Sequence, residues 1–191
     1  MRLFELFSAI LDYPDSQLSH RVDGAITLLS PLHGEAATLL KEFRAFLAKT
    51  PIGTMEEIYS RTFDLQAVCF PYVGYHLFGE DHRRGLFMAN LKGDYKANQF
   101  SCGNELPDHL GVMLHFLAIE SHGGQDEMID LCVIPALKKM VAGLDGTSNP
   151  YRGVLESLLL VLQELRSSSI EEFQDSESGS IDSATPKEVE N

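Results

Sequence analysis

Apolar residues recur every three or four positions along most of the chain, which is the spacing of one face of an α-helix. The first periodic segment ends at Tyr13-Pro14, because proline disfavours the helical conformation in the residue before it. Two further segments end at Ser30-Pro31 and before Pro51. The pattern therefore predicts three short amphipathic helices ahead of Pro51.

Capping residues mark two later helix starts. Thr54 with Glu57 three positions on is a capping box, in which each side chain binds a free backbone amide of the other residue. It predicts a helix that begins at Thr54. Asn149 before Pro150 is typical of an N-cap followed by proline at the first helical position. It predicts a final, strongly apolar helix.

The middle of the chain alternates broken and periodic stretches. Residues 69–80 are aromatic and interrupted by proline and glycine, so we expect an ordered connection there, whereas residues 82–97 show helical spacing again. Pro107 fits the first turn of another helix. The inward face of that helix is expected to hold Leu110, Met113, Leu114 and Leu117. Pro135 is placed where it would kink the helix that follows.

No segment alternates apolar and polar residues as a strand would, and no internal repeat is visible. We therefore predict an all-α fold, a single bundle of about seven to nine helices. The bundle is expected to cover residues 1–166 as one domain. Residues 167–191 are rich in Ser, Glu and Asp with little to bury, so they predict an acidic, disordered C-terminal tail.

The charge of the chain narrows its possible partners. The net charge is −13, from 28 acidic and 15 basic residues. Nucleic-acid binding requires clustered Lys and Arg, and the basic residues here are scattered, so nucleic acid is excluded as a partner. An acidic surface suits a cationic peptide, or it serves solubility alone.

Cysteine usage and the N-terminus indicate a compartment. The cysteines are widely spaced and lack a C-x-x-C pair, so they fit neither a disulfide framework nor a four-ligand zinc site. Glu5 and Asp12 interrupt the apolar start before a signal peptide could form, and no run reaches the roughly 18 apolar residues of a membrane span. We expect a cytoplasmic protein without a membrane span.

Motifs for catalysis and cofactor binding are missing from the sequence. There is no Glu-x-x-His pair, H-E-x-x-H, phosphate-binding loop or G-x-S-x-G nucleophile motif. His109, His115 and His122 leave a metal-dependent enzyme as an alternative, although no carboxylate or thiolate at ligand spacing supports it. We expect no catalytic residue, no cofactor and no metal.

Glu105, Asp108 and His109 form the remaining candidate cluster, at a predicted helix start. Acidic groups at a helix N-terminus complement the dipole and cap free amides in any protein, which explains Asp108. The same dipole disfavours a cation. His109 is therefore expected either to stay neutral or to pair with Glu105 or Asp108.

Three motifs together resemble a known family. They are E-L-P-D-H-L at residues 105–110, R-R-G-L-F-M at residues 83–88 and Y-x-x-x-F-D at residues 59–64. In this combination they resemble the NarJ branch of the NarJ/TorD/DmsD family of redox-enzyme maturation chaperones, over roughly residues 1–165.

The resemblance implies an all-helical, cytoplasmic, non-enzymatic chaperone that binds an unfolded client. The implied client is the N-terminal segment of the catalytic α subunit of a respiratory nitrate reductase. The chaperone would keep the apo-subunit competent for molybdenum cofactor insertion and delay its docking to the membrane. Molybdenum cofactor delivery proteins are further candidate partners. A different molybdoenzyme of the dimethyl sulfoxide reductase family is the alternative client, and nucleotide binding lacks any visible phosphate site.

A client of this kind is expected to bind as a partly helical peptide, with its apolar face in a groove and its basic residues against acid. The expected groove contains Phe70, Tyr72, Tyr75 and Phe78, unless these rings serve core packing alone. The polar edge is expected to hold Glu105, Asp108 and His109, and Pro107 between them is a further expected client-binding residue. Arg83 and Arg84 would be solvated or pair with that edge. Because residues 69–80 form a long connection, both a monomer and a domain-swapped dimer are open.

Overall fold

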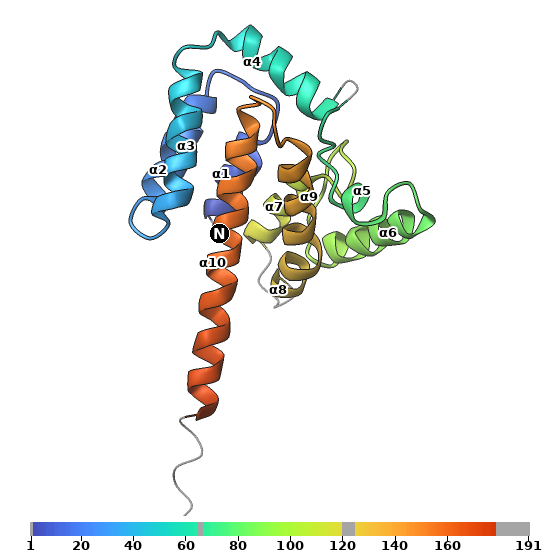
Figure 1. Ribbon diagram of the computed structural model, residues 1–191. Helices are drawn as coiled ribbons and strands as arrows, with labels where there is room; N and C mark the ends of the chain where they lie inside the picture. Colours follow the sequence, from blue (N-terminus) through green and yellow to red (C-terminus); the bar gives the residue numbers. More distant parts are fainter. Residues whose placement is uncertain (1, 65–66, 120–124, 179–191) are drawn as a thin grey trace, which may run out of the picture.

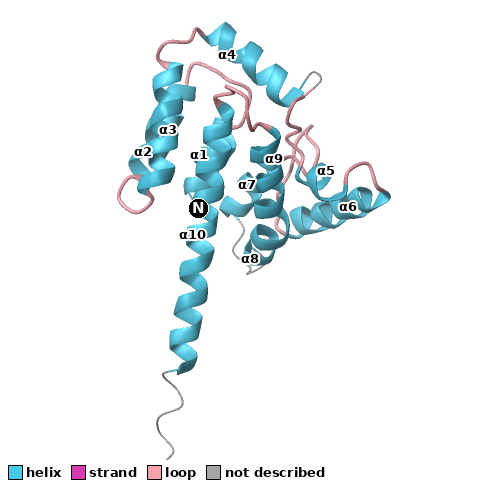
Figure 2. Cartoon of the chain, viewed as in Figure 1, coloured by secondary structure: helices cyan, strands magenta, loops and turns pink. Residues whose placement is uncertain are grey.

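The computed structural model describes residues 2–64, 67–119 and 125–178, with side chains up to residue 168. Helices and connecting loops make up these ranges, and they contain no β-strand (Figure 2). One isolated antiparallel β-bridge joins Tyr72 to His109. The predicted all-α class is confirmed.

The helices lie close to the predicted segments. They are α1 (Arg2–Ile10), α2 (Leu18–Leu29), α3 (Gly34–Leu47), α4 (Ile52–Tyr59), α5 (Val73–Phe78), α6 (His82–Ala97), α7 (Leu110–Ile119), α8 (Gln125–Met128), α9 (Ile134–Gly143) and α10 (Tyr151–Ser178). Two π-helical segments, Ser60–Asp64 and Ile129–Val133, extend α4 and join α8 to α9. With these continuous stretches counted once, the described ranges hold nine helices, within the predicted number.

The bundle is built around α7. Helix α1 packs on α7, while α2, α3 and α10 form one flank, and α9 lies between α10 and α5 (Figure 1). Helix α6 is at the opposite edge and packs mainly on α5. Leu110, Met113, Leu114 and Leu117 are buried, as predicted. Phe116 and Ala118 are buried as well, so α7 is enclosed on almost every side, as expected of a central helix.

Two predicted helix starts have different outcomes. Asn149 accepts a hydrogen bond from the Tyr151 amide at 3.0 Å, so its prediction as the cap of α10 is confirmed. The capping box at Thr54 is wrong. Helix α4 begins at Ile52 after Pro51, and the Thr54 amide already donates to the Pro51 carbonyl at 3.0 Å. Proline loses no amide hydrogen bond at a helix start, so the helix opens there.

Two other expectations change in the structure. The predicted kink at Pro135 takes the form of the π-helical segment before it, in which the Ile134 amide donates to the Ile129 carbonyl. The disordered tail does not begin at residue 167, because α10 continues to Ser178. Glu and Gln are good helix formers, and they follow Arg166 without a proline or glycine before Ser178. Residues 179–191 lie outside the described residues, where the tail stays a prediction.

Within the described ranges, none of the helices combines the length and the apolar character that crossing a membrane requires.

Candidate functional site

The E-L-P-D-H-L motif and the aromatic connection meet in space. The Val73 amide donates to the Asp108 carbonyl at 2.7 Å, and the Leu110 amide donates to the Pro71 carbonyl at 2.8 Å. These two bonds form the bridge that sets Tyr72 beside His109. The start of α5 is therefore fixed directly against the start of α7, which brings two of the sequence motifs together.

Arg84 pairs with the E-L-P-D-H-L motif, which is one of the two alternatives predicted for it; the other was exposure to solvent. Its Nε donates to Asp108 Oδ2 at 2.8 Å and its Nη2 contacts Oδ1 at 3.4 Å. The guanidinium also lies over the rings of Tyr72, at 5.2 Å, and Tyr75, at 5.9 Å. Arg83 instead binds the exposed Asp81 at 3.2 Å. The two neighbouring arginines therefore have different environments.

Pro107 and Asp108 do not open the helix as predicted. Helix α7 begins at Leu110, and both residues lie buried in the turn before it. The Pro107 carbonyl accepts from the Tyr95 hydroxyl at 2.8 Å, and the Asp108 carboxylate binds Arg84 rather than free amides. The Asp108 side chain is 0% exposed. Pro107 and Asp108 therefore expose little surface at the expected edge, and their part in client binding stays a prediction.

The capping role falls to His109 instead. Its Nδ1 accepts a hydrogen bond from the Gly111 amide at 3.2 Å, at the opening of α7. Burial lowers the pKa of His109, and the nearby carboxylates of Glu105, Asp12 and Asp108 oppose this only in part. The imidazole is therefore neutral at pH 7, as the first predicted alternative had it. Because Nδ1 accepts, the proton of the neutral ring is assigned to Nε2.

Glu105 remains at the surface. Its Oε1 accepts from the Leu106 amide at 2.9 Å and from the Tyr72 hydroxyl at 3.4 Å. Burial of the Tyr72 ring, together with the Glu105 charge, raises the pKa of Tyr72. Neither Glu105 nor the exposed Asp12 forms an ion pair with a basic residue in the described part of the chain.

These side chains border a polar cavity of about 260 Å³. Its lining includes Asp12 from the loop after α1, Tyr59 from α4, His109, and His115 from α7, besides Glu105 and Cys102. Sequence reasoning missed the contribution of α1. Asp12 is remote from the motif in sequence, and only the packing of α1 on α7 brings them together.

The predicted aromatic groove takes a different form. Phe70 packs on Tyr75 with ring centroids 4.5 Å apart, and Phe78 packs on Phe87 at 5.6 Å. All four predicted rings are half-buried, and they do not line the polar cavity. Phe70 and Tyr75 pack on each other, the Arg84 guanidinium lies over Tyr72 and Tyr75, and the Arg83 guanidinium lies over Phe78 at 5.8 Å. Contacts within the chain therefore cover part of each ring.

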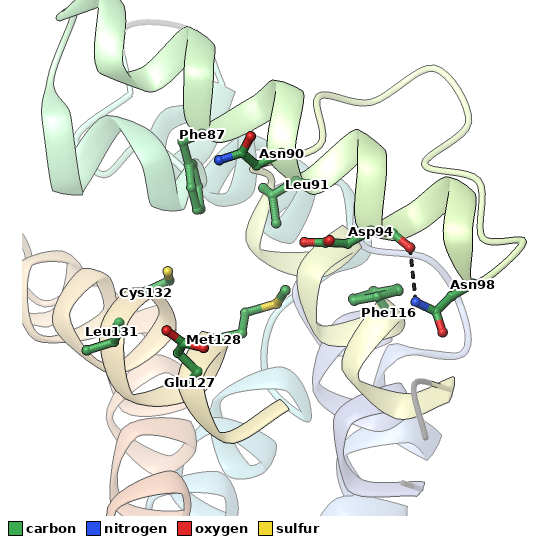
Figure 3. Close-up of a pocket in the computed structure, with 10 residues that line it drawn as sticks. All are labelled: Phe87, Asn90, Leu91, Asp94, Asn98, Phe116, Glu127, Met128, Leu131 and Cys132. Carbon is green, nitrogen blue, oxygen red and sulfur yellow. Dashed lines mark hydrogen bonds between the residues drawn. The ribbon is translucent and has the colours of Figure 1, made fainter. Parts of the chain in front are cut away.

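A larger hollow lies between α6, α7 and the segment from α8 to Val133 (Figure 3). Its volume is about 530 Å³ and its walls are mainly apolar. We call it the α6–α8 groove; it is lined by Phe87, Asn90, Leu91, Asp94, Asn98, Phe116, Glu127, Met128, Leu131 and Cys132. Sequence reasoning did not anticipate it, because its two walls come from segments far apart in the chain.

The structure shows no set of ligands that would support the alternative of a metal-dependent enzyme, within the residues that it describes. In the part of the chain that the structure describes, no group of three or more His, Cys, Asp or Glu side chains is placed to hold an ion. His109 and His115 both border the polar cavity, whereas His122 lies outside the described residues.

The helical fold matches that of a solved structure. It aligns with the crystal structure of a candidate redox enzyme maturation protein from Archaeoglobus fulgidus with a TM-score of 0.60. The alignment covers 85% of this chain and 94% of that one, at 22% identity. The profile of the nitrate reductase delta subunit family matches residues 30–144, which is more than half of the chain. The chain therefore belongs to the nitrate reductase delta subunit family.

Two bacterial relatives extend the similarity beyond the matched region. The NarJ protein of Bacillus subtilis is 26% identical over 165 residues, which cover 85% of this chain and 89% of that protein. The NarW protein of Escherichia coli is 25% identical over 180 residues, or 93% of this chain and 75% of the relative. Both are named as nitrate reductase molybdenum cofactor assembly chaperones. The family resemblance drawn from the sequence motifs is confirmed.

Proposed function

We propose that this chain is a chaperone for the assembly of a nitrate reductase, and that it acts without catalysing a reaction. The observation that carries this proposal is the similarity over most of the chain to two proteins named as nitrate reductase molybdenum cofactor assembly chaperones. Under this proposal the chain binds the N-terminal segment of the apo catalytic subunit. By binding this segment, the chaperone keeps the subunit competent for molybdenum cofactor insertion. It also delays docking of the subunit to the membrane until the cofactor has been inserted.

The polar cavity supplies a recognition site for a basic side chain of the client. Glu105 and Asp12 present carboxylates that no basic residue of the described chain neutralises. A Lys or Arg of the client in this cavity would form charge-assisted hydrogen bonds with them. The Nε2 proton of neutral His109 is the complementary donor, suited to a backbone carbonyl of the same segment.

The aromatic rings and the two arginines take distinct parts in this proposal. Tyr72 connects Glu105 to His109, because its hydroxyl binds the carboxylate and its ring packs edge-on against the imidazole at 5.6 Å. The half-buried rings of Phe70, Tyr75 and Phe78 remain the proposed apolar contacts beside the cavity. The pair of Arg84 and the buried Asp108, together with Pro107, holds the rings and the polar cavity in position, and the exposed Arg83 can contact the client.

Calorimetric titration of the full chain with a synthetic peptide tests the proposal. The peptide is the N-terminal segment of the nitrate reductase catalytic subunit from the same organism. We expect binding with a negative heat-capacity change, because apolar surface is buried. The matching segment of a catalytic subunit from the dimethyl sulfoxide reductase family serves as the competing client. Absence of binding for the nitrate reductase segment at about 100 µM, a concentration that would reveal even a weak complex, rejects the proposed client.

Charge reversal tests the cavity. Glu105→Lys should weaken peptide binding about tenfold at low salt, and by less at high salt, where exposed charges are screened. Glu42→Lys, at an exposed acidic position of α3, makes the same change in net charge away from the cavity. Equal losses for the two variants would show that only overall charge matters.

A further inference from the structure

A second pocket lies directly beside the polar cavity, at the end of α6. Its volume is about 370 Å³, and its lining comes from α6 and from the connection between α6 and α7. We call it the lysine pocket; it is lined by Lys92, Tyr95, Lys96, Gln99, Phe100, Ser101 and Cys102. Phe100, Ser101 and Cys102 also line the polar cavity. The two sites therefore share one wall, residues 100–102.

Buried contacts hold that shared wall in place. The Phe100 amide donates to the Tyr95 carbonyl at 2.8 Å, and the two rings pack edge-on with centroids 5.0 Å apart. The hydroxyl of the buried Tyr95 donates to the Pro107 carbonyl at 2.8 Å, which ties α6 to the E-L-P-D-H-L motif. The lysine pocket and the polar cavity therefore keep a fixed position relative to each other.

The two sites carry opposite charges. Lys92 and Lys96 are exposed, and because they are four residues apart they lie on the same face of α6. Neither ammonium group forms an ion pair or a hydrogen bond with a residue that the structure describes. Like charges at this spacing repel, so the stability of the helix does not explain them. Asp12 and Glu105 of the polar cavity also lack a basic partner in the described ranges. Two unpaired cations therefore adjoin two unpaired anions across one wall.

Gln99 lines the lysine pocket in a strained backbone conformation. Its φ angle is +54°, and among the described residues it is the one residue other than glycine with a positive φ. The Gln99 amide donates to the Lys96 carbonyl at 3.2 Å, so with the Phe100 bond to Tyr95 the helix ends in the way that normally uses glycine. A side chain at this position costs free energy that glycine would not. Strain of this kind is frequent at functional sites, and here it leaves an amide group in the lining of the pocket.

We propose that the lysine pocket binds an acidic side chain of the client subunit, next to the basic side chain that enters the polar cavity. Lys92 and Lys96 hold the carboxylate by charge-assisted hydrogen bonds, and the side-chain amide of Gln99 supplies a further donor. Because the two sites share a wall, the two client residues are close together along one segment. The identity of the partner rests on the proposed function, whereas the pair of opposite charges that it must carry rests on the two sites.

Other occupants fit these sites less well. Nucleic acid requires many clustered basic residues, and the pocket offers two lysines in a chain of net charge −13. The same net charge repels a second copy of the chain. A free inorganic anion would bind the lysines but would leave Asp12 and Glu105 without a partner. A client segment with both charges neutralises the lysines and the two carboxylates together.

Charge reversal in the lysine pocket tests the inference through the sign of its effect. The probe is a synthetic peptide, the N-terminal segment of the nitrate reductase catalytic subunit from the same organism, titrated calorimetrically into the full chain. Lys92→Glu/Lys96→Glu should weaken binding about tenfold at low salt, because the peptide carboxylate then meets like charge. Long-range attraction alone predicts the opposite, since a more acidic chaperone attracts a basic segment more strongly.

The matched control is Lys41→Glu/Lys49→Glu, at exposed positions in and just after α3. It makes the same change in net charge away from the pocket, and it should bind the peptide at least as tightly as the unaltered chain does. Equal effects of the two double variants overturn the inference.

Gln99→Gly separates a binding role from a structural one. The substitution removes the backbone strain, so the urea midpoint should rise. Loss of the amide donor should at the same time weaken binding of the peptide about threefold, as for one hydrogen bond. Unchanged affinity in the stabilised variant contradicts the part assigned to Gln99.

A second peptide assigns the effect to a carboxylate. In it every Asp and Glu of the client segment is replaced by Asn or Gln. It should bind the unaltered chain about tenfold more weakly than the natural segment, and Lys92→Glu/Lys96→Glu should not weaken it further, because the two changes remove the same contact. A natural segment that binds but has no acidic residue, or equal losses for both peptides in the lysine variant, overturns the inference and leaves the proposed function standing. A natural segment that does not bind overturns both.

Discussion

The Arg84 guanidinium and the Asp108 carboxylate form an ion pair in which Nε lies 2.8 Å from Oδ2 and the Asp108 side chain is removed from solvent. The pair joins the first turn of α6 to the turn that precedes α7. Because the Asp108 carbonyl also accepts from the Val73 amide, the same residue holds the start of α5. Three elements around the candidate site therefore meet at one residue, Asp108, through its carboxylate and its backbone carbonyl.

Loss of this pair should destabilise the fold strongly. Removal of one partner leaves the other charge buried and unpaired, so Arg84→Met and Asp108→Asn should each lower the free energy of unfolding by about 3 kcal/mol. Urea denaturation followed by circular dichroism measures the change. Arg83→Met is the control, because Arg83 pairs with an exposed aspartate, and it should cost less than about 1 kcal/mol. Similar losses at the two arginines would contradict a structural role specific to Arg84.

Gly74 is expected to be irreplaceable for a steric reason. A Cβ atom at Gly74 would lie 2.6 Å from Asp108 Oδ2 and 3.0 Å from the Phe87 ring. Gly74→Ala should therefore destabilise the protein by about 1–3 kcal/mol, as overpacking does. Gly93→Ala on α6 is the matched control, since nothing lies within 4 Å of its Cβ. It should stabilise the helix by about 0.5–1 kcal/mol. If urea denaturation shows no loss of stability in Gly74→Ala, the side chains of Arg84 and Asp108 can shift easily to make room for the methyl group.

The local pattern of the sequence predicts most of the helices but little of the site. The spacing of apolar residues over 82–97 predicts α6 at its observed bounds, because that spacing is set by the helix itself. The role of Asp108 is set by Arg84, which is 24 positions earlier in the chain. From its neighbours alone Asp108 resembles a helix cap, so local reasoning assigns its carboxylate to amides that it does not bind.

Tertiary packing also determines the two hollows. The polar cavity joins Asp12 to His109 because α1 packs on α7, and the α6–α8 groove joins Leu91 to Met128 across different helices. No periodicity within one segment carries this information. Residues 105–110 lie within residues 30–144, which the family profile matches, and Pro107 and Asp108 in this motif are buried.

The stability of the protein should depend on pH through His109. Burial holds the pKa of His109 below the ordinary value of 6.5, and burial lowers the pKa of His76 in the same way. The unfolded chain therefore binds these protons more readily than the folded chain. The stabilisation is fully present above about pH 6.5 and is lost as the pH falls toward the lowered pKa values of the folded state. Urea midpoints measured from pH 7.5 to 5 should decrease accordingly.

The substitution His109→Asn tests whether His109 causes this pH dependence. In His109→Asn the amide oxygen can still accept from the Gly111 amide, but the side chain does not titrate. The variant should show a shallower decrease of the urea midpoint between pH 7.5 and 5 than the unaltered protein. The imidazole proton signals of His109 in a parallel NMR titration should report a pKa below 6.5. An unchanged slope in the variant would assign the effect to other groups.

Arg166 is expected to control the order of the wall that carries Met128. Its guanidinium lies 2.9 Å from an Asp130 oxygen and 2.6 Å from an Asp126 oxygen, so it ties α8 and the following π-helical segment to α10. Both carboxylates are partly exposed, so Arg166→Met should cost only about 1 kcal/mol of global stability. Amide hydrogen exchange over residues 125–133 should rise, because local opening needs less free energy than global unfolding. Arg152→Met is the control, since Arg152 pairs with Asp145 and Glu156 near the start of α10. It should leave exchange in residues 125–133 unchanged, and equal exchange in the two variants would show that Arg166 does not hold this wall.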